Sequence, residues 1–289
     1  MKTQLYHIEF LTPCFGAGAD QTKAELRPSE IRGQLRWWFR ALGGTLQQER
    51  KAFGGVHQDQ PVSSKLLVRV HQQPQGEKND WTSRIERQGV GPETYLLGFF
   101  CGKTGRLNAT GALPPGSKAV IEILFKETPS ELLELALEAF FSMGALGFRI
   151  TRCAGALCSE EYKLNEQGWS KLSEKLTAKG FQVTLIGKPF NNWVDLITHA
   201  GTLLKNGLRG RNGLGISAGA GGTRPNALGS AKPRQASVLH LRPVRIDNQL
   251  RLALIEAPHG RILGPPALRA HNNRGSIIAL ARERKIIQR

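Results

Sequence analysis

The chain has 289 residues, of which 40 are Lys or Arg and 23 are Asp or Glu, giving a formal net charge of +17 at pH 7. A hydrophobic fraction of 40% excludes an intrinsically disordered chain, and the length allows two domains of ordinary size. The surplus positive charge favours a partner rich in negative charge, most often nucleic acid. Residues 200–289 carry 16 Lys and Arg against 3 Asp and Glu, so we expect the electrostatic footprint there.

Membrane insertion and metal binding find no support in the sequence. Nowhere do 18 apolar residues follow one another, and the first residues lead directly into an alternating strand pattern. We therefore expect a soluble, cytoplasmic protein without membrane contact. The cysteines form no C-x-x-C pair and have no His cluster beside them, so they indicate reduced, mostly buried thiols, with no metal and no cofactor. They are Cys14, Cys101, Cys153 and Cys158.

The first predicted elements are a strand over residues 4–10, a loop over 11–23 and a helix over 27–44 with Ser29 as its N-cap. One arc of this helix is apolar and predicts a core face; it holds Ile31, Leu35, Trp38, Phe39 and Leu42. Arg32, Arg36 and Arg40 recur every four residues on a neighbouring arc. This arginine stripe predicts either a solvated face or a track for RNA phosphates, with Trp37 beside it for stacking. Trp37 and Trp38 are also candidates for a subunit interface.

The rest of the first half alternates between strands and a helix. Strands are predicted over residues 65–70, 95–101 and 118–125. A capping box that begins at Thr128 opens a helix, and Gly144 ends it. A glycine-punctuated segment, residues 144–155, then leads into a final strand. The order strand, helix, strand, strand, helix, strand is typical of a ferredoxin-like domain, which we place at residues 1–160.

The second half, residues 161–289, has the pattern of a reduced copy of the same domain. It predicts a strand over 181–186, a helix over 193–204 that Gly207 ends, and a strand pair over 237–244 and 249–255. We therefore predict an α+β protein of two ferredoxin-like domains, the second strongly basic.

A glycine-rich segment follows the second predicted helix, and it combines unobstructed backbone N–H groups with basic side chains. Such a segment can wrap closely around a phosphodiester backbone, although a flexible linker has a similar composition. A dinucleotide-binding fingerprint is excluded, because the segment follows a helix and not a strand. The candidate RNA-binding residues here are Arg209, Arg211, Gly213, Gly215, Arg224, Lys232 and Arg234.

Several motifs in fixed order carry a family resemblance. The stretch RPSEIRGQLRWWFRAL at residues 27–42 follows F-L-T-P at 10–13 and precedes F-G-G at 53–55. In this order and spacing the motifs resemble the RAMP proteins of type III CRISPR systems, most closely the first-subunit family of the Cmr (type III-B) complexes. The resemblance covers most of the chain apart from residues 72–94, 160–190 and the tail.

The resemblance implies RRM-like ferredoxin domains whose glycine-rich loops bind RNA. In the first loop it assigns this role to Gly144, Gly147, Arg149, Arg152 and Gly155, whereas Cys153 and Ala154 depart from the family pattern. It further implies a non-catalytic subunit of an antiviral ribonucleoprotein that contacts the 3′ region of crRNA and target RNA beside other Cmr or RAMP subunits. Such a subunit holds phosphates and sugars without reading bases, because the guide reads sequence by pairing.

Two other functions remain open at this stage. A metal-independent endoribonuclease that processes guide precursors would need a general acid or base, for which His7, His240 and His259 are candidates. A lone His in an apolar strand is more often a core residue. Relatives that cut target RNA use a loop Asp, and Asp20 lies in a comparable loop without an assigned role. The third possibility is a basic structural protein of another ribonucleoprotein.

Overall fold

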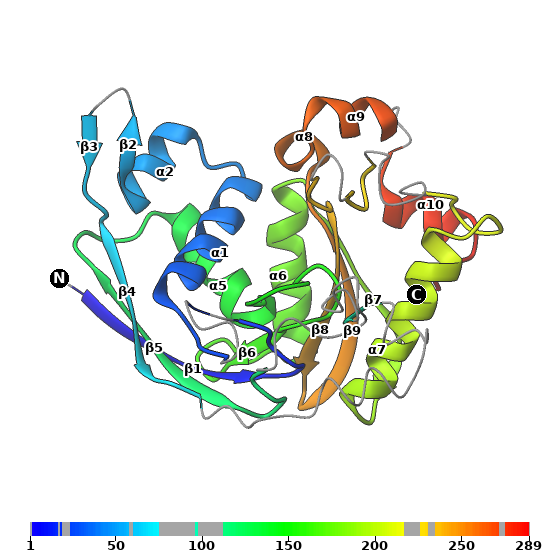
Figure 1. Cartoon of the computed structure of the whole chain (residues 1–289), viewed down its shortest axis with the longest axis horizontal. Coiled ribbons are helices and arrows are strands. Elements are labelled where there is room, and N and C mark those ends of the chain that lie inside the picture. The colour runs from blue at the N-terminus through cyan, green and yellow to red at the C-terminus, as the bar shows by residue number, and fades with distance from the viewer. Residues whose placement is uncertain are drawn as a thin grey trace.

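The first half of the chain forms a four-stranded antiparallel sheet with the strand order β4-β5-β1-β6 (Figure 1). The computed structural model describes residues 2–16, 18, 24–57, 60–74, 96–97, 112–216, 226–230, 235–271 and 275–288. The four strands are β1 (Lys2–Phe10), β4 (Leu66–Gln72), β5 (Lys118–Phe125) and β6 (Leu157–Ser159). Alternate residues of β1, which include Tyr6, Ile8 and Phe10, are buried and give the sheet one core face.

Two helices cover that core face, α1 (Pro28–Ala41) and α5 (Glu131–Met143). A short excursion follows α1 and consists of α2 (Leu46–Phe53) and the hairpin of β2 (Gly55–His57) and β3 (Gln60–Val62). Without this excursion, the element order and the strand order are those of a ferredoxin-like domain, as predicted.

The second half contains a three-stranded antiparallel sheet with the order β7-β9-β8. Its elements are β7 (Gln182–Phe190), α7 (Trp193–Thr202) with its π-helical continuation η2 (Leu203–Leu208), β8 (Leu239–Ile246) and β9 (Gln249–Glu256). This is the ferredoxin-like arrangement without a fourth strand, and the predicted α+β fold class is confirmed. Asp247 and Asn248 connect β8 to β9 with φ angles of 47° and 62°, as a tight hairpin requires.

Helix α6 (Glu166–Ala178) stands between the two sheets in Figure 1. Its Leu172 and Leu176 belong to the same hydrophobic cluster as Val244 and Ile246 of β8. Leu239 and Leu241, which point to the other face of β8, belong to a second cluster with residues of α7 and η2. Both faces of β8 are therefore buried, and the first cluster contains residues from both halves. The domain boundary at residue 160 stays a prediction.

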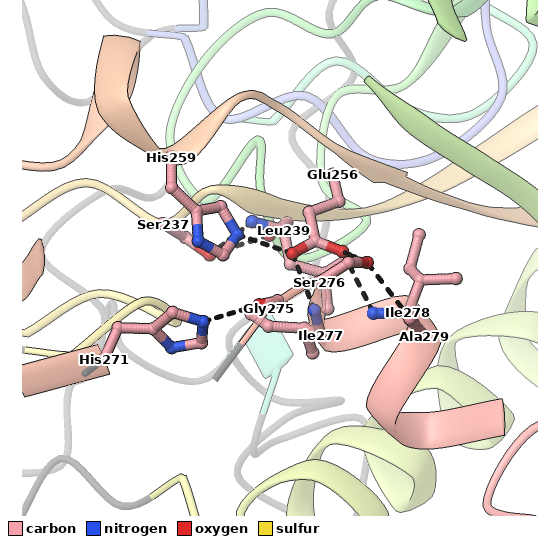
Figure 2. A network of polar contacts seen from close by, with 10 residues as sticks. All are labelled: Ser237, Leu239, Glu256, His259, His271, Gly275, Ser276, Ile277, Ile278 and Ala279. Carbon is pink, nitrogen blue, oxygen red and sulfur yellow. Dashed lines mark hydrogen bonds and ion pairs between the residues drawn. The ribbon is translucent and has the colours of Figure 1, made fainter. Parts of the chain in front are cut away.

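Three short helices follow β9, namely α8 (His259–Ile262), α9 (Pro265–His271) and α10 (Ile277–Glu283). Figure 2 shows how the Glu256 carboxylate, at the end of β9, holds α8 and α10. It accepts hydrogen bonds from His259 Nε2 and Ser276 Oγ at 2.6 Å, and from the amides of Ile277 and Ile278 at 2.7 and 3.0 Å. Burial alone would raise the pKa of Glu256, but these hydrogen bonds outweigh it and lower the pKa.

Two of the three predicted helix starts were placed wrongly, whereas α7 begins at Trp193 as predicted. Helix α1 begins at Pro28 with Arg27 as N-cap, because the fixed φ of proline suits the first helical position and leaves Ser29 inside the first turn. Helix α5 is capped by Ser130, whose hydroxyl accepts from the Leu133 amide, and not by Thr128. This start places Leu133 in the core, which local cap chemistry alone does not reveal.

Other differences concern one predicted strand and two helices that were not predicted. Of the strand predicted over residues 95–101, only Leu96 and Leu97 are described, and they are helical and buried. The helices α2 and α6 were missed, although Thr45 and Asn165 are good N-caps. No helix in the described ranges is long and apolar enough to cross a membrane.

We expect Glu256→Gln to lower the free energy of unfolding by about 1–3 kcal/mol, because an amide cannot accept from all four donors. The lowered pKa means that this contribution is complete above the pKa of an unfolded carboxyl group and is lost as pH falls through the folded value. Urea unfolding at neutral and acid pH measures both effects. Glu283→Gln, on the exposed side of α10, is the matched control. Equal stability of Glu256→Gln and the wild type at neutral pH would contradict the role given to this carboxylate.

Candidate nucleic-acid interface

The arginine stripe of α1 binds α2 within the chain. Arg36 Nε lies 2.8 Å from one carboxylate oxygen of Glu49, and Arg40 Nε lies 3.2 Å from the other. Arg32 donates to the carbonyl of Phe53 at the end of α2. Glu49 is only 5% exposed, whereas the side chain of Arg40 is 58% exposed. The stripe therefore fastens α2, and three arginines against one glutamate leave positive charge at the surface; RNA contact by the stripe stays a prediction.

Trp37 and Trp38 lie on two sides of α1 and have different surroundings. Trp38 is 1% exposed and stacks on Phe181, with ring centroids 5.7 Å apart. It has no surface left for a partner subunit. Trp37 is half-buried, and its ring lies 4.7 Å from that of His240 on β8. Trp37 thus joins the first domain to the sheet of the second.

The first glycine-rich segment, residues 144–155, uses its backbone donors within the chain. The Gly147 amide donates to the Glu30 carboxylate, and the Gly155 amide donates to Pro13 O at 2.8 Å. Gly155 has φ +62°, and a Cβ there would overlap the carbonyl oxygen of Leu146. The Gly144 amide closes the end of α5. The glycines therefore allow backbone to pack on backbone, and a role of these residues in RNA binding stays a prediction.

The same segment connects the two domains along β8. The Cys153 amide donates to Leu241 O at 3.1 Å, and the Leu241 amide donates to Thr151 O at 3.2 Å. Of its two arginines, Arg149 donates from Nε to Leu96 O at 2.8 Å, and Arg152 is 5% exposed.

The second glycine-rich segment contains both packed and open positions. A Cβ at Gly213 would overlap the Gly207 carbonyl, so Gly213 is needed for packing against the end of η2. Arg211 and Gly215 are exposed, and a Cβ at Gly215 would meet no atom within 4 Å. Arg211 is thus exposed, whereas Arg209 is half-buried, and RNA contact by Arg211 stays a prediction. The remaining predicted contacts, Arg224, Lys232 and Arg234, lie outside the described residues, as does Asp20.

Basic side chains from both halves converge beside the carbonyl oxygen of Leu228. Arg152 donates to this oxygen, and Arg209 Nη2 lies 3.5 Å from it. His240 and Arg242 of β8 belong to the same site, because the charges of Arg242 and Arg152 both lower the pKa of His240. We define the basic centre as Trp37, Arg152, Arg209, His240 and Arg242. The sequence analysis did not identify Arg242 as a site residue. A charged residue within a mostly apolar strand could have indicated it.

The basic centre is electropositive, and three of its five residues, Arg152, His240 and Arg242, are buried. Arg242 is 2% exposed, and its Nη2 lies 3.0 Å from His240 Nδ1. Burial lowers the pKa of Arg242 to about 10. Burial, followed by the charges of Arg242 and Arg152, lowers the pKa of His240 well below its usual value, so His240 is neutral. No ion pair neutralises Arg242 within the described part of the chain.

The other two candidate histidines lie in separate acidic contacts. His7 Nδ1 is 2.6 Å from Glu161 Oε1 on the exposed face of the first sheet, and His259 is bound to the buried Glu256. Within the described residues, no group of three or more His, Cys, Asp or Glu is arranged to hold a metal ion.

Two ferredoxin-like halves with a basic centre between them place the chain in the class of tandem RRM-like folds. Residues 7–158 match the family model of the RAMP superfamily, which is more than half of the chain. The chain therefore belongs to the RAMP superfamily, and the resemblance of its sequence motifs is confirmed.

Two relatives come from Pyrococcus furiosus (strain ATCC 43587 / DSM 3638 / JCM 8422 / Vc1). The CRISPR system Cmr subunit Cmr1-1 is 31% identical over 146 residues, which are 46% of this chain and only 40% of that protein. The Cmr subunit Cmr1-2 is 26% identical over 181 residues, which are 54% of this chain and 95% of that protein.

Solved structures show the same fold over almost the whole chain. Apo Cmr1 from Pyrococcus furiosus has a TM-score of 0.60 at 21% identity, covering 97% of this chain and 93% of that one. A chain of the type III-B Cmr-beta complex bound to cognate target RNA has a TM-score of 0.51 at 11% identity, covering 97% and 98%.

We expect Gly155→Ala to lower the free energy of unfolding by at least about 2 kcal/mol, because alanine is strained at this φ and its Cβ would overlap a backbone oxygen. Thermal or urea unfolding of the purified chain measures the loss. Gly260→Ala is the control, since a Cβ at Gly260 meets no atom within 4 Å. If the two variants were equally stable, the segment would be an open loop and not a packed connection.

Proposed function

We propose that the chain is an RNA-binding, non-catalytic subunit of a type III-B (Cmr) CRISPR effector complex, an RNA-guided antiviral ribonucleoprotein of the cytoplasm. Its partners are crRNA, target RNA and other Cmr or RAMP subunits, and it contacts the 3′ region of the crRNA and its target. Membership of the RAMP superfamily and similarity to two Cmr1 subunits support the assembly. The net charge of +17 supports the RNA ligand.

The observation that carries the proposal is the convergence of the basic centre. Trp37 comes from α1, Arg152 and Arg209 come from the two glycine-rich segments, and His240 and Arg242 come from β8. These elements are far apart in sequence, yet the fold brings their cationic and aromatic side chains to one place. Arginine recognises phosphate, and aromatic rings stack on bases without sequence preference. This chemistry suits a subunit that holds RNA whose sequence is read by base pairing.

The non-catalytic assignment rests on the surroundings of the candidate histidines. His240 is buried, neutral and bound to Arg242, so its Nδ1 is not available as a base. His259 is bound to a carboxylate that also closes α10. His7 is the most accessible of the three, and its pairing with Glu161 makes it the residue to mutate if cleavage is found.

Charge reversal at the exposed Arg211 should weaken RNA binding to a similar extent for every sequence. Loss of one phosphate contact should also reduce the slope of log Kd against log salt by about 1. Fluorescence anisotropy with several unrelated single-stranded RNAs, at a series of salt concentrations, measures both. Arg211→Glu is a cleaner variant than Arg209→Glu, because Arg209 also contacts Leu228 O. Lys171→Glu on the exposed side of α6 is the control. A loss confined to one RNA sequence would contradict the proposal.

The alternative, a metal-independent endoribonuclease, is tested by incubating the purified chain with end-labelled repeat-spacer RNA in EDTA. Native and denaturing gels separate binding from cleavage. We expect a mobility shift with intact RNA. Specific cuts within the repeat that disappear in His7→Ala, while the shift persists, would replace the proposed function by the nuclease.

A further inference from the structure

Two residues of the basic centre have buried hydrogen-bonding atoms without a partner. Arg242 Nε and Nη1 are inaccessible to solvent and make no hydrogen bond to any described residue. His240 Nε2 is equally inaccessible and makes no hydrogen bond of ordinary geometry to a described residue, although the Ser237 backbone interacts with the imidazole and raises its pKa slightly against the larger lowering by burial. Both side chains are 2% exposed. A buried donor without a partner costs free energy, and a buried charge without a counter-charge costs more. Among the described residues, Arg242 therefore has no group that neutralises its charge.

All three of these atoms are donors. A guanidinium group has no acceptor, so in the 3.0 Å contact with Arg242 Nη2 the acceptor is His240 Nδ1. The neutral imidazole of His240 then carries its proton on Nε2. Arg242 contributes two further N–H groups. A ligand that completes this site must accept several hydrogen bonds and carry negative charge.

Charge and shape narrow the class of ligand. Arg152 lies close enough to act on the same histidine, so the ligand enters the field of two guanidinium groups. A phosphate group offers several acceptor oxygens and matches this charge, whereas a water molecule supplies no charge and chloride is a single point acceptor. We propose that Arg242 and His240 form a buried binding site for a phosphate group at the junction of the two domains. Its identification as an RNA phosphodiester rests on the proposed function, and free phosphate shares the same chemistry.

Two neighbours close the site. The carbonyl of Leu228 accepts from Arg152 on one side, and the half-buried ring of Trp37 lies over His240 on the other. Leu228 is buried and Trp37 is partly exposed, so we place the opening through which the phosphate enters beside the Trp37 ring.

The test is thermal unfolding of the purified chain in increasing inorganic phosphate at constant ionic strength. We expect the wild-type Tm to rise and level off, because a ligand that binds only the folded state stabilises it. Arg242→Met should abolish this response. Its Tm without phosphate should equal or exceed that of the wild type, because an apolar side chain of similar length removes the unpaired donors.

Two further variants test whether the phosphate response depends on this site and not on a general change in stability. Arg261 also connects the halves, but it donates to Ala41 O and Lys179 O at 2.9 and 2.8 Å, so Arg261→Met should keep the phosphate response. His240→Phe keeps a ring beside Trp37 and removes the Nε2 donor, and it should need several-fold more phosphate for the same rise. This variant tests the site even if Arg242→Met does not fold.

RNA binding by the same variants identifies the ligand. If an RNA phosphate occupies the site, Arg242→Met should raise the Kd for single-stranded RNA about tenfold relative to Arg261→Met, as expected for one charge-assisted hydrogen bond. An unchanged Kd assigns the site to free phosphate. A chain that responds to phosphate but binds no RNA would keep the site and refute the proposed function. An equal phosphate response in the wild type, Arg242→Met and His240→Phe would overturn the site itself.

Discussion

The backbone pairing between residues 151–153 and β8 is the constraint on which the rest of the molecule depends. A three-stranded sheet leaves β8 at an edge, where its unpaired backbone groups would need water or another strand. The hydrogen bonds between Cys153 and Leu241, and between Leu241 and Thr151, occupy this edge with a segment of the other domain. The missing fourth strand is thus replaced in part from the first domain, and the two halves share one hydrophobic cluster.

This pairing also explains where the charges lie. It brings Arg152 next to Arg242 and places α1 over His240, so that cationic side chains are enclosed at the junction. Burial of a cationic side chain lowers the free energy of unfolding unless a counter-charge neutralises it. An apolar side chain of similar size at the same position would pack without this loss. The arginines of α1 differ in this respect, because Glu49 pairs with Arg36 and Arg40. The stripe is a structural contact that leaves positive charge at the surface, whereas Arg242 has no counter-charge among the described residues.

A division of roles between the two glycine-rich segments follows from their surroundings. The amides of residues 144–155 donate hydrogen bonds to Pro13, Glu30 and Leu241. The bond to Leu241 holds the two domains together. In the second segment Arg211 and Gly215 remain at the surface. In the proposed function, phosphate contacts from such a surface would position the RNA and leave sequence recognition to base pairing. Stability and RNA binding are therefore open to separate measurement by substitutions in the two segments.

The sequence by itself determined the α+β class, the order of the ferredoxin-like elements and the end of α5 at Gly144. These features depend on periodicity, on turn chemistry such as that of Asp247 and Asn248, and on charge, all of which act over a few residues. Only the tertiary structure decided that the arginine stripe meets Glu49, that Trp37 lies on His240, and that Arg242 is buried. In each case the partner is distant in sequence, or the burial comes from the other domain, and no local pattern records which distant surface will cover a side chain.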